Sequence, residues 1–209
     1  MSKSQTSKKL VPKQEKGSKS DTAHSVTLKT IKEAKELYSM AKNRLLDISH
    51  WDKLCGPVSG TFHLMDNRGN QSERLAIQGD YLKIDVPGPG SKTGDGFDWV
   101  KIESIEEDRA NADHEEIAIK VRPTHNPRSI KNETAHFFKE DSTSTFIVRR
   151  DKNMLIAEVH GRNELANINP NKPLDAVRNT LMALSAMLGL SSTQWKKLVK
   201  GLLSMKKLR

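Results

Sequence analysis

The segment VHGRNELAN, residues 159–167, brings together side chains that can bind an anion or move a proton. His160, Arg162 and Glu164 stand at every second position, and Gly161 allows the chain to turn beside them. A histidine beside an arginine and a carboxylate can hold a phosphate or carboxylate group, or act in acid–base chemistry. The alternative is structural, with Arg162 and Glu164 simply paired with each other.

A second polar segment, RPTHNPR at residues 122–128, holds Arg122 and His125 close to two prolines. If this segment lies at a sheet edge near His160 and Arg162, the two segments together form an electropositive pocket. Such a pocket suits a phosphate or carboxylate ligand, because guanidinium groups bind these anions through paired hydrogen bonds.

The glycine-rich stretch VPGPGSKTGDGFDW, which contains the loop of residues 87–98, invites comparison with a phosphate-binding loop. The Walker pattern requires glycine immediately before Lys92 and again five residues earlier, but Ser91 and Val86 stand there. A strand pattern follows the stretch, whereas a phosphate loop opens a helix. We therefore expect a stiff hairpin loop at the sheet rim, with Asp98 among its polar groups.

The C-terminal stretch LMALSAMLGLSSTQWKKLVKGLL has the helix–turn–helix outline of DNA-binding motifs. Its second helix carries Lys196, Lys197 and Lys200, which can contact phosphates, and Gln194, which can reach a base edge. Two alternatives remain open. The pair of helices can pack on the sheet as a hairpin with exposed lysines, or the second helix can bind an anionic surface or partner.

Metal, cofactor and covalent chemistry have little support in the sequence. The seven histidines are scattered without a close pair at ligand spacing, and Cys55 is the only cysteine. No G-x-S-x-G nucleophile motif occurs. The sequence therefore predicts neither a metal site nor a cofactor, and it names no catalytic set, which leaves open whether the protein is an enzyme.

The net charge of +9 lies at the two ends of the chain. Residues 1–21 carry +4 and residues 193–209 carry +6, which leaves the middle nearly neutral. Residues 1–24 contain few apolar side chains, so we expect a disordered basic tail, followed by a single domain over residues 25–209. Basic ends of this kind favour a polyanion such as nucleic acid, or a protein partner.

The apolar pattern predicts three blocks of secondary structure. First comes a helix that Ser25 or Thr27 can cap. Over residues 58–160 the period changes to two, which indicates about six to eight strands joined by short turns. Helical periodicity returns over residues 173–209 as two helices. The predicted fold is therefore α+β, with an N-terminal helix, a mostly antiparallel sheet or small barrel, and a C-terminal αα-hairpin.

These observations leave two functions open. The first is a non-enzymatic binding module whose basic termini engage a polyanion or a protein partner. The second is a small-molecule or anion pocket, or an enzyme, with its site at the sheet rim formed by loops 87–98, 122–128 and 160–164. A single cysteine, no signal-peptide pattern and no long apolar segment predict a cytoplasmic protein.

Overall fold

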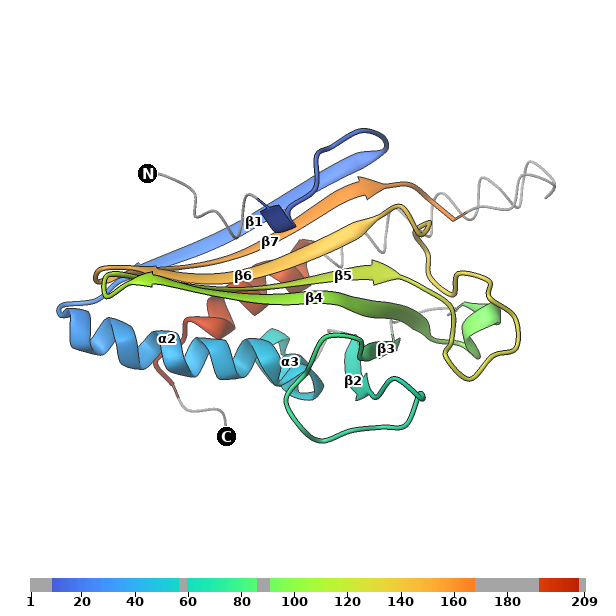
Figure 1. The fold of residues 1–209 in the computed structure, drawn as a ribbon, viewed down its shortest axis with the longest axis horizontal. Coiled ribbons are helices and arrows are strands. Elements are labelled where there is room, and N and C mark those ends of the chain that lie inside the picture. Colours follow the sequence, from blue (N-terminus) through green and yellow to red (C-terminus); the bar gives the residue numbers. More distant parts are fainter. Residues whose placement is uncertain (1–8, 57–59, 86–90, 168–191, 207–209) are drawn as a thin grey trace.

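The computed structural model describes residues 9–56, 60–85, 91–167 and 192–206. They form a seven-stranded antiparallel sheet with helices packed against one face (Figure 1). The strand order is β1-β7-β6-β5-β4-β3-β2, so β1 and β2 are the two edges and the described strands form an open sheet rather than a closed barrel. The predicted α+β class with a large antiparallel sheet is confirmed.

We call the face that packs against the helices the inner face and the opposite one the outer face. The elements in chain order are β1 (Ser18–Thr27), α2 (Ile31–Leu46), the 3-10 turn η1 (Ile48–His50), α3 (Trp51–Cys55), β2 (Thr61–Met65), β3 (Tyr81–Asp85), the 3-10 turn η2 (Lys92–Gly94), β4 (Asp98–Asn111), β5 (His114–Pro123), β6 (Thr143–Asp151) and β7 (Met154–Glu164). A further helix spans residues 192–202.

The strands on either side of the RRDKN turn, β6 and β7, form a hairpin that lies between β1 and β5 in the sheet. β6 and β7 pair in continuous register from Asp151 opposite Met154 to Thr143 opposite Arg162. Lys152 takes the left-handed conformation, with φ of 54°, that a tight two-residue turn requires. Alternate residues of β7 face inward and are buried, as a period of two requires, whereas residues 145–148 of β6 are buried on both faces of the sheet.

Helix α2 lies across the inner face, against β6 and β7. It begins after Thr30, whose side chain accepts from the Glu33 amide while the Glu33 carboxylate accepts from the Thr30 amide. This reciprocal capping box starts the helix later than the predicted caps at Ser25 or Thr27 would. The buried residues recur at spacings of three and four, namely Ala34, Leu37, Tyr38, Ala41 and Leu45.

The N-terminal region departs from the prediction of a disordered tail over residues 1–24. Ser18–Thr27 form the edge strand β1, which pairs with β7 along most of its length. Before it, Leu10 is buried on the outer face against Ala118 and Ile147. The expectation fails because an edge strand is fixed by backbone pairing, which needs no apolar side chains of its own.

The helix over residues 192–202 closes the main core from the C-terminal side. Its buried residues are Leu198 and Val199, with Leu202 and the following Leu203. Gly201 brings it against α3, since a Cβ there would lie only 2.8 Å from the Cβ of Leu54. The second predicted helix of the αα-hairpin is thus observed, whereas the first lies outside the described residues.

Arg44 of α2 caps this last helix. Its guanidinium donates to the carbonyl oxygens of Leu202 at 3.1 Å, Ser204 at 2.6 Å and Lys206 at 2.7 Å. Carbonyl groups at a helix C-terminus have no hydrogen-bond donor within the helix. A donor from another element therefore stabilises the helix most at this end. The contact ties the C-terminal helix to α2 across the core.

Arg44→Gln is therefore expected to lower the free energy of unfolding by about 2–3 kcal/mol, because hydrogen bonds from a charged donor are lost. Urea unfolding measures the loss, and hydrogen exchange at residues 198–203 locates it. Arg68→Gln, at an exposed loop position, is the matched control. Equal stability of the two variants would show that the cap has no energetic role.

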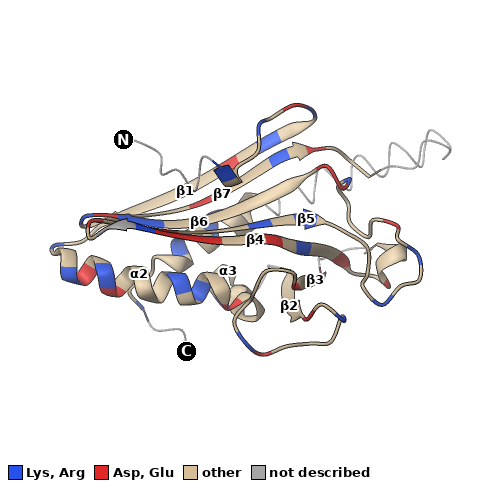
Figure 2. Cartoon of the chain, in the orientation of Figure 1, with Lys and Arg blue, Asp and Glu red and all other residues tan. Residues whose placement is uncertain are grey.

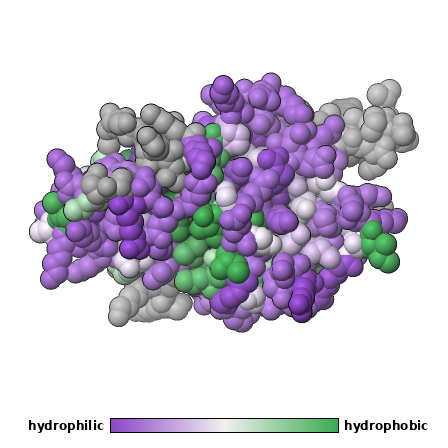
Figure 3. Space-filling view, viewed as in Figure 1, coloured by the Kyte–Doolittle hydropathy of each residue, from purple (hydrophilic) through white to green (hydrophobic). Residues whose placement is uncertain are grey.

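Charges of both signs share the surface. Figure 2 shows basic and acidic residues interspersed along α2, β4 and β5. Lys42 of α2 pairs with Glu107 of β4 at 2.6 Å, and Lys120 of β5 pairs with Glu103 at 3.0 Å. Most of the face seen in Figure 3 is hydrophilic, with a hydrophobic region near its middle. Within the described residues, no helix is long and apolar enough to span a bilayer.

Candidate functional site

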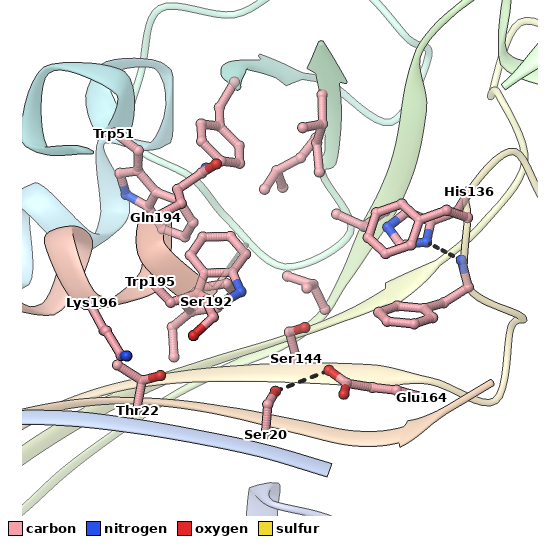
Figure 4. A pocket seen from close by; sticks show the side chains of 18 of the residues that line it. Ser20, Thr22, Trp51, His136, Ser144, Glu164, Ser192, Gln194, Trp195 and Lys196 are labelled. Atoms are coloured by element: carbon pink, nitrogen blue, oxygen red, sulfur yellow. Dashed lines mark hydrogen bonds between the residues drawn. The ribbon is translucent and has the colours of Figure 1, made fainter. Parts of the chain in front are cut away.

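A cavity of about 360 Å³ lies between the inner face of the sheet and the helix over residues 192–202 (Figure 4). Every strand of the sheet contributes at least one residue to its wall. The lining residues are Ser20, Asp21, Thr22, Trp51, Phe62, Leu82, Ile84, Val100, Val121, His136, Phe137, Phe138, Ser144, Phe146, Glu164, Ser192, Gln194, Trp195 and Lys196.

Aromatic rings form one side of the cavity. Trp51 of α3 packs on Phe146 of β6 with ring centroids 4.8 Å apart and on Phe62 of β2 at 5.5 Å. Trp195 of the last helix meets Phe146 edge-on at 5.2 Å. Because each ring is held by its neighbours, these residues give a large apolar wall in a fixed arrangement.

His136 stands on the other side of the cavity, away from Trp51 (Figure 4). Two backbone hydrogen bonds of 2.8 Å fix the preceding residue: the Ala135 amide donates to Thr124, and the Ala135 carbonyl accepts from Trp99. The imidazole stacks on Phe137, with ring centroids 4.2 Å apart. The segment is thereby anchored to the ends of β4 and β5.

The His136 ring is neutral and has a defined tautomer. Burial lowers its pKa to about 3, because an apolar surrounding disfavours the imidazolium. Its Nδ1 accepts a hydrogen bond from the Phe138 amide at 2.9 Å, which assigns the proton to Nε2. No hydrogen bond from another described residue reaches Nε2, so this N–H can serve as a donor to a ligand in the cavity.

A β-bulge turns the Glu164 side chain toward the same cavity. Alternation along β7 would send Glu164 outward together with Arg162. However, Ser20 of β1 pairs with Gly161, whereas Ser18 pairs with Glu164, so β7 has one extra residue in this interval. The extra residue reverses the alternation, and Glu164 lines the cavity.

The extra residue is Asn163, which adopts φ of 57°. Residues of the N-terminal segment hold it in place: its Oδ1 accepts from the amides of Glu15 at 2.8 Å and Lys16 at 3.3 Å. Its own amide donates to Gln14 Oε1 at 3.0 Å. We call Gln14, Glu15 and Lys16 the N-terminal clamp. The clamp stabilises the bulge that points Glu164 inward.

The Glu164 carboxyl group lies over Gly161 between two serine hydroxyls. Ser20 Oγ donates to Oε1 at 3.0 Å, and Ser18 Oγ donates to Oε2 at 3.3 Å. A Cβ at residue 161 would overlap both Glu164 Oε1 and Ser20 Oγ. Glycine at this position therefore provides the space that the carboxyl group occupies.

Burial raises the pKa of Glu164, and the serine hydrogen bonds oppose that rise only in part. Within the described chain, no lysine, arginine or histidine forms an ion pair with this carboxyl group. The cavity therefore contains an acidic group whose hydrogen-bonding partners are neutral hydroxyls.

Neither a family model nor a curated protein sequence matches this chain. Among solved structures, the ZhuI aromatase/cyclase from Streptomyces sp. R1128 is 11% identical with a TM-score of 0.43, covering 88% of this chain and 94% of its own. Truncated norcoclaurine synthase from Thalictrum flavum is 9% identical with a TM-score of 0.39, covering 93% and 100%. A START superfamily protein from Mycobacterium smegmatis is 12% identical with a TM-score of 0.37, covering 89% and 99%. At these scores, no conclusion about this chain follows from the similarities.

Of the predicted rim cluster, only Glu164 lines the cavity. His160 and Arg162 instead bind Asp21 of β1, with His160 Nδ1 at 2.6 Å and Arg162 NH2 at 2.7 Å from Asp21 Oδ1. The predicted anion site at His160 and Arg162 is therefore already occupied by a carboxylate of the chain itself. The alternative pairing of Arg162 with Glu164 is not found either.

The other predicted pocket residues also lie elsewhere. Arg122 binds the Glu103 carboxylate and donates to the Glu140 carbonyl at 2.8 Å, and His125 does not line the cavity. Asp98 is buried outside the cavity, and burial raises its pKa to about 7. The electropositive rim pocket is therefore not formed, because neighbouring acids neutralise its arginines.

The residues predicted to contact nucleic acid take different places. Gln194 is turned inward, where its Oε1 accepts from the Gly60 amide at 3.3 Å, so it is not presented to a base edge. Lys196, Lys197 and Lys200 are exposed, as the packed-hairpin alternative predicts, and Lys196 stands at the cavity.

The lone cysteine does not offer a nucleophile. Cys55 is 1% exposed, and its Sγ donates to the Gln194 carbonyl at 3.6 Å. Burial raises the pKa of the thiol to about 12, so the reactive thiolate does not form near neutral pH. Cys55 is a core residue beside the last helix.

Proposed function

We propose that this protein binds a mainly apolar small molecule in the cavity between the sheet and the helix over residues 192–202. The observation that carries the proposal is a cavity of about 360 Å³ with an aromatic wall and a few polar groups opposite it. Ligand pockets typically measure about 300–1,000 Å³ and combine apolar walls with a small number of orienting polar groups.

The arrangement supports ligand binding more than it supports the nucleic-acid module that the charged termini suggested. The cavity wall is supplied mainly by rings and aliphatic side chains, whose burial of apolar ligand surface is worth roughly 25 cal/mol per Å². The lysines of the last helix stand on one exposed face without a base-reading residue beside them. The second function predicted from sequence, a small-molecule pocket, is therefore favoured, although its position differs from the predicted rim.

Titration of the full-length protein with the neutral fluorescent probe phenylnaphthylamine tests this proposal. We expect saturable, blue-shifted emission with one probe bound per chain, and displacement by non-fluorescent apolar molecules. Emission that rises linearly without saturation, or fails to rise, would overturn the proposed function.

A further inference from the structure

The chain uses several unusual features to bring one carboxyl group into an apolar cavity. The bulge at Asn163, the N-terminal clamp and the glycine at residue 161 all serve the position of Glu164. The carboxyl group accepts hydrogen bonds from Ser18 and Ser20, but its removal from water disfavours its charged form. The arrangement therefore indicates a role toward a ligand.

The polar groups on the Glu164 side of the cavity restrict what that ligand can be, whereas Ser192, Gln194 and Lys196 line it from the last helix. His136 presents Nε2–H, a donor only, and its ring stays neutral. Ser144 Oγ lines the cavity and forms no hydrogen bond with another described residue. The polar side thus offers an acceptor at Glu164, a donor at His136 and a hydroxyl that can act as either.

Two charged ligand classes fit this set poorly. A ligand carboxylate beside Glu164 would be repelled by it, and the lysine that lines the cavity, Lys196, stands on the side of the last helix rather than beside Glu164. A ligand ammonium group has donors only, so it would leave the Nε2–H of His136 without an acceptor. A hydroxyl group both donates and accepts, and therefore matches all three partners.

We propose that the pocket selects an apolar ligand that carries a hydroxyl group, an alcohol or phenol, which donates a hydrogen bond to the Glu164 carboxyl group. His136 supplies a donor to the same polar side, and the aromatic wall contacts the ligand body. This inference rests on the proposed function, because it names the ligand class of the same cavity.

Four ligands on one ring system test the selection: naphthalene, naphthol, naphthylmethylamine and naphthoic acid, substituted at the same ring position. Their dissociation constants are measured at neutral pH by displacement of phenylnaphthylamine from the full-length protein. We expect naphthol to bind about tenfold or more tightly than naphthalene, because one hydrogen bond to the Glu164 carboxyl group is gained. Naphthoate should bind most weakly.

Glu164→Gln should weaken naphthol binding by about tenfold, leave naphthalene binding unchanged and strengthen naphthoate binding. Gly161→Ala should have the same effect on naphthol without altering the carboxyl group, because the added methyl displaces it. Glu158→Gln is the control on the other face of β7, where Glu158 pairs with Arg149 at 2.9 Å.

The outcomes separate the two proposals. If naphthalene and phenylnaphthylamine bind but naphthol has no advantage, or Glu164→Gln leaves that advantage intact, the hydroxyl selection is wrong while the apolar pocket stands. If neither phenylnaphthylamine nor any of the four ligands binds, the proposed function itself is wrong, and the inference falls with it.

Discussion

Ser144→Trp is expected to weaken binding of phenylnaphthylamine at least about tenfold, a loss of roughly 1.4 kcal/mol or more. Ser144 lies at the middle of the cavity wall on β6, next to Gly161 of β7 in the sheet register. Its side chain is small, and an indole there would occupy the space between the aromatic wall and Glu164. The new side chain would exclude the ligand by volume and would leave the strand pairing intact.

Ser25→Trp is the matched control, since Ser25 is an exposed residue of β1 that does not line the cavity. The control variant should bind the probe like the unchanged protein. Binding is read from probe emission, which the added tryptophan does not obscure. Equal affinities of the two tryptophan variants would place the binding site outside the cavity.

His136→Asn is expected to remove most of an acid sensitivity that His136 gives the fold. The ring has a pKa of about 3 in the folded protein and about 6.5 when exposed. Below pH 6.5 the unfolded chain therefore binds a proton that the folded chain does not, and stability falls as the pH falls. At about 1.4 kcal/mol per pH unit, the loss from pH 6.5 to pH 4.5 is roughly 2–3 kcal/mol.

Asparagine is chosen because its Oδ1 can replace Nδ1 as acceptor for the Phe138 amide, and its amide N–H can replace Nε2–H. Urea unfolding at neutral pH and near pH 4.5 measures the effect. The unchanged protein should lose about 2–3 kcal/mol more than the variant. Asp98 and Glu164, whose pKa values burial raises, destabilise the fold as the pH rises, but they remain in both proteins and cancel in the difference.

The control is His24→Asn, the same substitution at a partly exposed position of β1. That variant should retain the pH profile of the unchanged protein. If His136→Asn and the unchanged protein lose equal stability on acidification, His136 is not held neutral by burial. The assignment of His136 as a neutral ring that presents Nε2–H to a ligand would then be wrong.

Much of the scaffold could be predicted from the sequence because its signals are local. The β6–β7 hairpin follows from two alternating strands around a polar turn, and α2 follows from apolar residues at spacings of three and four. Leu75 and Ile77 show the limit of such patterns: their alternating spacing is typical of a strand, but both are exposed and lie in a loop. Two apolar residues at alternate positions form part of a strand only if another strand lies beside them, and the local pattern does not show whether one does.

Most of the candidate site could not be predicted from the sequence, because contacts between residues far apart in the chain form it. Glu164 was expected to act with His160 and Arg162 on one face, and a single extra residue in β7 reverses its direction. The aromatic wall combines α3, β2, β6 and the last helix, which are far apart in the chain. The one available signal was the asparagine directly after Arg162, since asparagine tolerates the left-handed conformation that a bulge can require.

The central claim, that an apolar ligand enters the cavity, is tested most directly by the indole N–H signals of the three tryptophans. Trp51 and Trp195 line the cavity, whereas Trp99 lies in a separate cluster with Met65 and Tyr81. Addition of phenylnaphthylamine to the full-length protein should shift the Trp51 and Trp195 signals in proton–nitrogen correlation spectra and leave the Trp99 signal in place. A saturating probe that shifts only Trp99, or none of the three, would contradict the account.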